Sequence, residues 1–78
     1  MYCLYMVRCN DNSLYTGITT DLERRILEHN GSKKGAKYTK SRRPVTLVYE
    51  EKFENRAEAS KREYAVKKLT KSEKEELL

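Results

Sequence analysis

Short apolar runs near the start of the chain predict two neighbouring β-strands. Residues 2–9 are almost continuously apolar and rich in β-forming residues, as expected of a strand that is covered on both faces. Residues 14–18 form a second run of this kind. The link between them, Asn10-Asp11-Asn12-Ser13, consists of turn formers. The two runs therefore predict a β-hairpin.

Capping patterns and helical spacing predict a helix directly after the hairpin. Thr20-x-x-Glu23 has the form of a capping box, in which each side chain bonds the other residue's backbone N–H. The helix is expected to run to about Asn30, because Asn30-Gly31 is a typical helix end.

The second half of the chain predicts one more strand and two more helices. Pro44 precedes a third strand at residues 45–49. Asn55 is expected to cap a helix that reaches about residue 69. Thr70-x-x-Glu73 repeats the capping-box pattern, which predicts a last short helix over residues 72–78.

These elements predict an α+β fold, a small three-stranded, mostly antiparallel sheet flanked by helices in the order β-β-α-β-α-α. A chain of 78 residues is expected to form one domain over residues 1–78.

No apolar run approaches the roughly 20 residues of a membrane span. Cys3 and Cys9, six residues apart, would lie roughly 20 Å apart in a strand, too far for a disulfide. With no signal-type N-terminus, a reducing cytoplasm is the expected location.

The net charge of +5 favours polyanion partners. Residues 33–43 read KKGAKYTKSRR, with six basic residues and no acid. A solvated loop is the commoner explanation of such a run. An aromatic residue within it is typical of base stacking, which makes the run a candidate nucleic-acid contact. The candidate binding residues are Lys33, Lys34, Lys37, Tyr38, Lys40, Arg42 and Arg43.

The first predicted helix carries two polar side chains on its core face. Helical spacing from Leu22 puts Ile26, Arg25 and His29 on that face. Burying a guanidinium costs free energy unless it has a partner. Arg25 could instead lay its stem over the core and reach solvent, and a lone histidine is often structural. The two together, four residues apart, indicate an anion site, whereas Arg24 faces solvent.

Glu63 borders the buried side of the second long helix, which Ala59, Val66 and Leu69 mark. An ion pair with a base such as Arg25 is one interpretation. A metal ligand is the other, since one carboxylate with waters and a substrate phosphate is a normal magnesium arrangement.

Two tyrosines and a glycine complete the candidate site. Tyr5 and Tyr15 lie on neighbouring predicted strands, so their hydroxyls can approach one another if both face the same side. Either tyrosine alone could be a core residue with a solvated tip. Gly17 lies inside a strand, where glycine often marks a bulge or the close approach of another group.

In order and spacing these residues resemble the GIY-YIG nuclease superfamily, and in particular its short stand-alone bacterial members. The resemblance covers essentially the whole chain. It rests on Cys3-Leu4-Tyr5, Tyr15-Thr16-Gly17, Arg25, His29 and Glu63.

The resemblance implies a role for each matched residue. Glu63 matches the glutamate that holds a single divalent metal, Mg²⁺ or Mn²⁺. Arg25 matches the helix arginine and would stabilise transition-state charge. Tyr15 is the expected proton acceptor, Tyr5 supports it, and His29 contacts phosphate or relays the proton.

The sequence departs from the family pattern at three places. Cys3 replaces a glycine of the first motif, and Thr16 replaces an isoleucine of the second. No asparagine occurs in residues 64–78, where many members carry one.

The resemblance therefore implies a divalent-metal-dependent endonuclease that hydrolyses phosphodiester bonds in nucleic acid, with DNA as the expected substrate and repair or recombination as its setting. A small chain could rely on a partner protein for targeting. Two other hypotheses stay open. One is a nucleic-acid-binding module that has lost turnover, which the missing asparagine favours. The other is a protein-interaction adaptor, suggested by the mixed-charge final helix.

Overall fold

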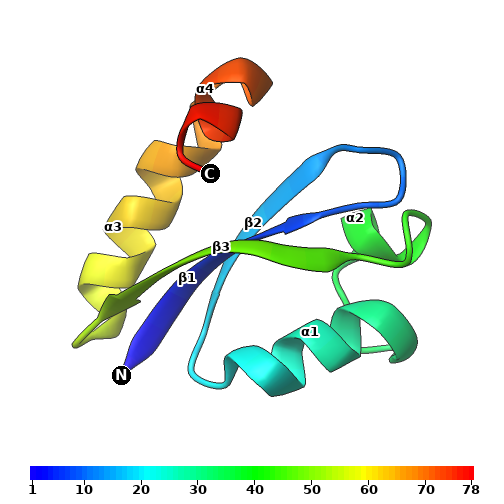
Figure 1. Ribbon diagram of the computed structural model, residues 1–78. Coiled ribbons are helices and arrows are strands. Elements are labelled where there is room, and N and C mark those ends of the chain that lie inside the picture. Colours follow the sequence, from blue (N-terminus) through cyan, green and yellow to red (C-terminus); the bar gives the residue numbers. More distant parts are fainter.

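Three strands and four helices make up the fold in a computed structural model that describes residues 1–78. The strands are antiparallel and lie in the order β2-β1-β3, so β1 is central. Figure 1 shows α3 on one side of the sheet and α1 on the other. The predicted α+β class and antiparallel sheet are confirmed. The elements are β1 (Tyr2–Arg8), β2 (Leu14–Thr19), α1 (Leu22–Gly31), α2 (Lys37–Lys40), β3 (Thr46–Phe53), α3 (Arg56–Lys67) and α4 (Lys71–Glu76).

The central strand is apolar throughout because helices cover both of its faces. Side chains alternate between the two faces of a strand. Leu4 and Met6 pack with Val66 of α3 on one face. Tyr5 and Val7 face the other way, and Leu22 and Ile26 of α1 pack against their cluster. The near-continuous apolar run in the sequence is thus two interleaved core faces.

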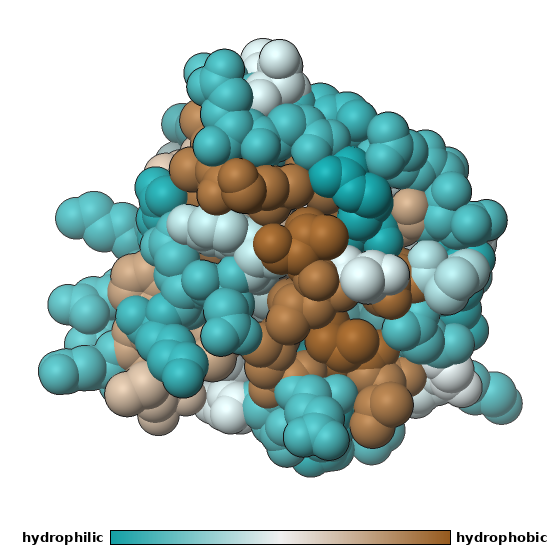
Figure 2. Space-filling view, in the orientation of Figure 1, coloured by the Kyte–Doolittle hydropathy of each residue, from teal (hydrophilic) through white to brown (hydrophobic).

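An apolar band remains visible on the surface. Figure 2 shows it crossing β3 and reaching α1. Leu27 of α1 is 68% exposed and Leu47 of β3 is 37% exposed. Together with Leu22 and Ile26 they line an apolar groove. None of the helices has the length and apolar character needed to span a membrane.

The predicted capping box at the start of α1 is wrong. Asp21 caps the helix instead, and its side chain accepts the backbone N–H of Arg24 at 3.2 Å. The hydroxyl of Thr19 accepts the N–H of Asp21 at 3.1 Å and so supports a start one residue later. The predicted caps of the other two helices are confirmed: Asn55 accepts from Glu58, and Thr70 forms a full capping box with its partner.

Two elements are longer or more ordered than the sequence indicates. β3 reaches Phe53, because its polar second half still pairs with β1 through Tyr2 and Phe53. The basic run is not all loop, since it contains the short helix α2.

The side chain of Asn30 connects α1 to the start of β3. Its amide donates to the carbonyl of Val45 at 3.0 Å and accepts the N–H of Val45 at 2.6 Å. Asn30 lies inside α1, which ends at Gly31, one residue later than predicted. The amide of Asn30 thus makes the pair of hydrogen bonds that the backbone of a neighbouring strand would make, and it fixes the start of β3 relative to α1.

Candidate active site

Both candidate tyrosines lie on the sheet face that α1 covers. Tyr5 pairs with Gly17 across the β1–β2 ladder, and Val7 pairs with Tyr15. Positions two apart share a face, so Tyr5, Tyr15 and Gly17 point the same way. A Cβ atom at Gly17 would stand 2.5 Å from the phenol oxygen of Tyr5. Glycine is therefore present because Tyr5 approaches closely, the second of the two reasons that the sequence suggested.

His29 of α1 joins the tyrosine face to α2. Its ring is completely buried. The Nε2 atom lies 2.7 Å from the hydroxyl oxygen of Tyr5, and Nδ1 lies 2.8 Å from the hydroxyl oxygen of Thr39. A buried imidazole bonded at both nitrogens is placed to hold or move a proton, but not to touch a phosphate at the surface.

Burial dominates the electrostatics of this pair. It lowers the pKa of His29 to about 4, and the positive charge of Arg25 acts in the same direction. Burial also raises the pKa of Tyr5, although hydrogen bonding and charge from Arg25 oppose that rise. Both groups are therefore uncharged at neutral pH.

Arg25 occupies the core-facing side of α1, as the spacing predicted. Its side chain is 25% exposed, against 66% for Arg24. The guanidinium donates to Glu28 at 3.0 Å and to the carbonyl of Lys34 at 2.8 Å. These bonds hold one side of the cation in place beside the phenol of Tyr5 and leave it partly accessible to an anion.

Tyr15 lies at the more open side of the cluster. It is half-buried, and its ring meets the edge of the His29 ring with centroids 5.3 Å apart. Tyr38 of α2 stacks on it at 5.7 Å with an angle of 25° between the rings. The phenol of Tyr15 is thus the more accessible of the two tyrosines.

Glu63 approaches the same region from α3. Its carboxylate is 23% exposed and pairs with Lys67 at 3.2 Å, while the ammonium of Lys67 lies 6.0 Å from the centre of the Tyr15 ring. The negative charge of Glu63 contributes to raising the pKa of Tyr5. Glu63 thus does form an ion pair, as one interpretation of the sequence expected, but its partner is Lys67, whereas Arg25 pairs with Glu28.

The arrangement can be compared with known proteins. Residues 1–76 match the family described as the GIY-YIG catalytic domain. The chain belongs to the GIY-YIG nuclease family. Its relatives include a UPF0213 protein of Desulfotalea psychrophila, 60% identical over 75 residues, which covers 96% of this chain and 68% of that protein. A UPF0213 protein of Halobacterium salinarum is 48% identical over 77 residues, which cover 99% of this chain and 99% of that protein.

Two solved structures agree with the fold. The solution structure of a UPF0213 protein from Bacillus halodurans has a TM-score of 0.62 and 47% identity, with 99% of this chain and 82% of that chain covered. A solution structure of an E. faecalis protein has a TM-score of 0.66 and 48% identity, with 96% and 79% covered.

A divalent metal, which the GIY-YIG family implies, would have Glu63 as its protein ligand. No group of three or more His, Cys, Asp or Glu side chains forms a metal cage. A single accessible carboxylate fits magnesium, which keeps several waters and takes further oxygens from a substrate phosphate. Glu63 would meet that requirement if a divalent metal ion displaced the ammonium of Lys67 from its carboxylate.

The basic run divides into two groups. The four lysines are exposed and take part in no ion pair of the structure. Tyr38, 39% exposed, lies among them and carries the guanidinium of Arg42 at 4.0 Å from its ring centre. These groups remain candidates for nucleic-acid contact. The lysines are Lys33, Lys34, Lys37 and Lys40.

The two arginines of the run already have partners inside the protein. Arg42 pairs with Asp11 at 3.0 Å. Arg43 donates to the carbonyls of Glu28, His29 and Ser32 at 3.3, 2.6 and 2.5 Å, and so caps the end of α1. A nucleic-acid contact through Arg43 would require it to leave this cap.

One departure from the GIY-YIG pattern has a structural consequence. Thr16, at the isoleucine position, is 2% exposed, and its hydroxyl oxygen has no hydrogen-bond partner. Leaving a buried hydroxyl unpaired costs free energy.

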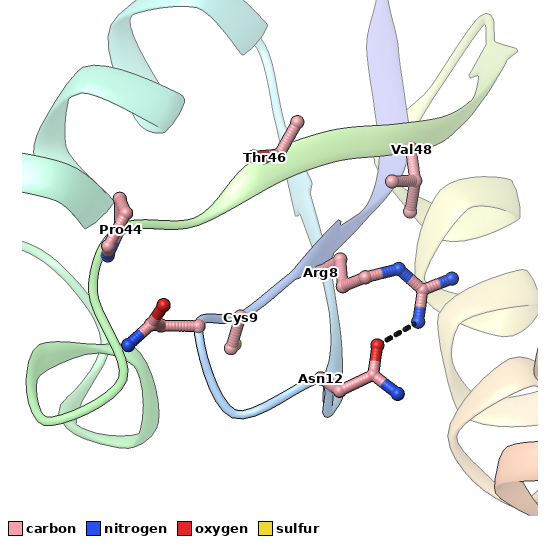
Figure 3. A pocket seen from close by; sticks show the side chains of 7 residues that line it. Arg8, Cys9, Asn12, Pro44, Thr46 and Val48 are labelled. Atoms are coloured by element: carbon pink, nitrogen blue, oxygen red, sulfur yellow. Dashed lines mark hydrogen bonds between the residues drawn. The ribbon is translucent and has the colours of Figure 1, made fainter.

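Sequence reasoning missed Thr39, which lies within the basic run and is completely buried. A polar residue in such a run carries no signal of burial. An open cavity also went unpredicted (Figure 3). It lies where β1 ends and β3 begins, is lined by Arg8, Cys9 and Pro44 among others, and contains none of the candidate site residues.

Proposed function

We propose that this protein is a divalent-metal-dependent endonuclease that hydrolyses phosphodiester bonds in nucleic acid, with DNA as the expected substrate. One observation carries the proposal. The imidazole of His29 bonds Tyr5 at 2.7 Å and packs against Tyr15 at 5.3 Å, and Arg25 lies beside the same phenol. Residues from two strands and a helix thus form one cluster of proton-handling and anion-binding groups.

The two tyrosines would have different roles. Tyr5 is 1% exposed, whereas Tyr15 is half-buried, so Tyr15 is the phenol that can meet water or substrate. An ionised Tyr15 would raise the pKa of Tyr5 further, which keeps the proton on Tyr5. Tyr15 would accept a proton from the attacking water, and Tyr5 with His29 would fix the geometry around it.

Arg25 and Glu63 would act on the phosphate. The guanidinium of Arg25 would stabilise the negative charge that develops at phosphorus oxygens in the transition state. Glu63 would hold Mg²⁺, which when bound supplies Lewis-acid stabilisation of the phosphate and of the leaving oxygen. The exposed lysines of the basic run would bind the phosphate backbone of the substrate.

The central experiment measures cleavage of single-stranded, duplex and branched DNA in Mg²⁺, in Mn²⁺ and in excess chelator. Tyr15→Phe should lower turnover by about 10²–10⁴-fold because it removes only the hydroxyl. Arg25→Gln should lower it by about 10²–10³-fold. The matched control is Arg24→Gln, one residue away and 66% exposed, which should have little effect. Equal defects in the two arginine variants would contradict the assignment.

The metal role is tested at Glu63. Glu63→Gln keeps the shape and removes the charge, so cleavage should disappear while affinity for DNA changes little. Glu58→Gln removes an exposed glutamate of the same helix and serves as the control. Full turnover by Glu63→Gln in Mg²⁺ would remove Glu63 from the mechanism. If the wild type binds DNA but cleaves no substrate in either metal, the binding-module hypothesis replaces this proposal.

A further inference from the structure

Thr39 makes a buried contact that the proposed mechanism does not use. It lies in α2, within the basic run, and is completely buried. Its hydroxyl oxygen lies 2.8 Å from Nδ1 of His29 and 3.0 Å from the carbonyl oxygen of Ala36, to which it donates. A hydroxyl has a single proton. If that proton goes to Ala36, Nδ1 of His29 must carry its own proton and donate to Thr39.

The other end of the chain of hydrogen bonds agrees with this direction. The guanidinium of Arg25 can only donate, and its positive charge acts on the pKa of the Tyr5 phenol. This cation favours a phenol that gives its own proton to Nε2 of His29, 2.7 Å away. His29 is the one hydrogen-bond partner of the Tyr5 hydroxyl, so in the opposite tautomer Nε2–H would point at the phenol oxygen and the buried phenol proton would have no acceptor. Leaving such a group unpaired costs about 1–3 kcal/mol.

The direction of the chain is therefore set at both ends. Tyr5 donates to His29, and His29 donates to Thr39. The last member, the carbonyl of Ala36, can only accept. Among these groups, Thr39 is the one that decides which nitrogen of the imidazole carries the proton.

We propose that Thr39 is a positioning residue of the active site, which holds His29 as the Nδ1–H tautomer and, through Tyr5, aims the guanidinium of Arg25. The catalytic part of this inference rests on the function proposed above, whereas the tautomer does not. With Nε2 as an acceptor, the phenol proton points away from Arg25. The oxygen of Tyr5 then presents only lone pairs to the guanidinium, which keeps the cation turned toward the site.

The tautomer can be measured in the free protein. His29 is the only histidine of the chain, so ¹⁵N-histidine labelling gives an unambiguous NMR spectrum. In the wild type at neutral pH, Nδ1 should have the chemical shift of a protonated nitrogen and Nε2 that of an unprotonated one. A wild type with the proton on Nε2 would overturn the proposal without any variant.

Two substitutions test the role of the hydroxyl. Thr39→Val keeps the shape and removes the acceptor, so the two nitrogen shifts should move toward a mixture of tautomers or toward Nε2–H. Thr39→Ser keeps the hydroxyl and should keep the wild-type shifts. A Thr39→Val protein with the wild-type spectrum would overturn the proposal. If that variant does not fold, the wild-type spectrum alone still decides the tautomer.

Kinetics test the link to Arg25. Thr39→Val should lower kcat by about 10–100-fold with little change in KM, and Thr39→Ser should restore it. Altered tautomers with unchanged kcat would overturn the positioning role. A wild type without turnover would refute the proposed function, and the NMR measurement would still confirm or refute the tautomer assignment.

Discussion

Mild acid should weaken the fold mainly through His29, because the carboxylates whose pKa values are lowered titrate at lower pH. The ring is completely buried, and its pKa is about 4 in the folded protein against an ordinary value of 6.5. The unfolded chain therefore binds a proton at a higher pH than the folded protein does. The stabilisation is present in full above about pH 6.5 and is lost as the pH falls from 6.5 through 4.

The size of the loss follows from the two pKa values. They differ by about 2.5, from 6.5 − 4, which corresponds to about 3 kcal/mol once the pH is below both. By pH 5 about 2 kcal/mol of this should be lost. A domain of this size is expected to have a total stability of roughly 4–12 kcal/mol. The change should therefore lower the thermal midpoint by roughly 10 °C.

Urea unfolding at pH 7, 6 and 5, followed by circular dichroism, measures the effect. The control is His29→Gln, which cannot titrate in this range but keeps a hydrogen-bonding side chain. Its stability should be lower at pH 7 and nearly constant down to pH 5. A wild type whose stability stays constant from pH 7 to 5 would refute the reasoning. So would a His29→Gln variant that retains the pH dependence, because the effect would then belong to other groups.

Three further substitutions test packing around the site by urea unfolding. Gly17→Ala should lower stability by about 1–3 kcal/mol and reduce any cleavage activity, because the added Cβ would stand 2.5 Å from the oxygen of Tyr5. Normal stability and activity in this variant would show that the phenol is not held there. Thr16→Val should raise stability by about 1 kcal/mol, since it removes a buried hydroxyl without a partner, and a loss would mean that the hydroxyl is bonded. Arg43→Met should lower stability by about 1.5–3 kcal/mol, because the carbonyls at the end of α1 lose their donor. Its neighbour Arg42→Met loses a more exposed ion pair and should lower stability by at most about 1 kcal/mol. The reverse order would contradict the capping role of Arg43.

Much of the fold could be predicted because its signals are local. The two interleaved faces of β1 make an apolar run that is typical of a central strand. The caps at Asn55 and Thr70 depend on residues three positions away, and both are confirmed. The start of α1 was predicted wrongly because Thr19, Thr20 and Asp21 compete for the same role. Which of them caps the helix depends on the turn that leaves β2.

Part of the candidate site was also visible in the sequence. Helical spacing put Arg25 and His29 on the face of α1 that packs on the sheet, and the structure has them there. Period-two alternation allowed Tyr5, Tyr15 and Gly17 to share a face, but only if the strands paired in register. The register pairs Tyr5 with Gly17, which explains the glycine by close approach.

The sequence by itself therefore determined three strands, three of the four helices, the class of sheet and the buried face of α1, because periodicity and caps act over a few residues. The tertiary structure alone decided what each polar group meets. It buried Thr39 against His29, turned Arg43 onto the end of α1, and left the hydroxyl of Thr16 without a partner. Hydrogen bonds act over about 3 Å and depend on direction. Their partners can be known only when segments distant in the chain have been brought together.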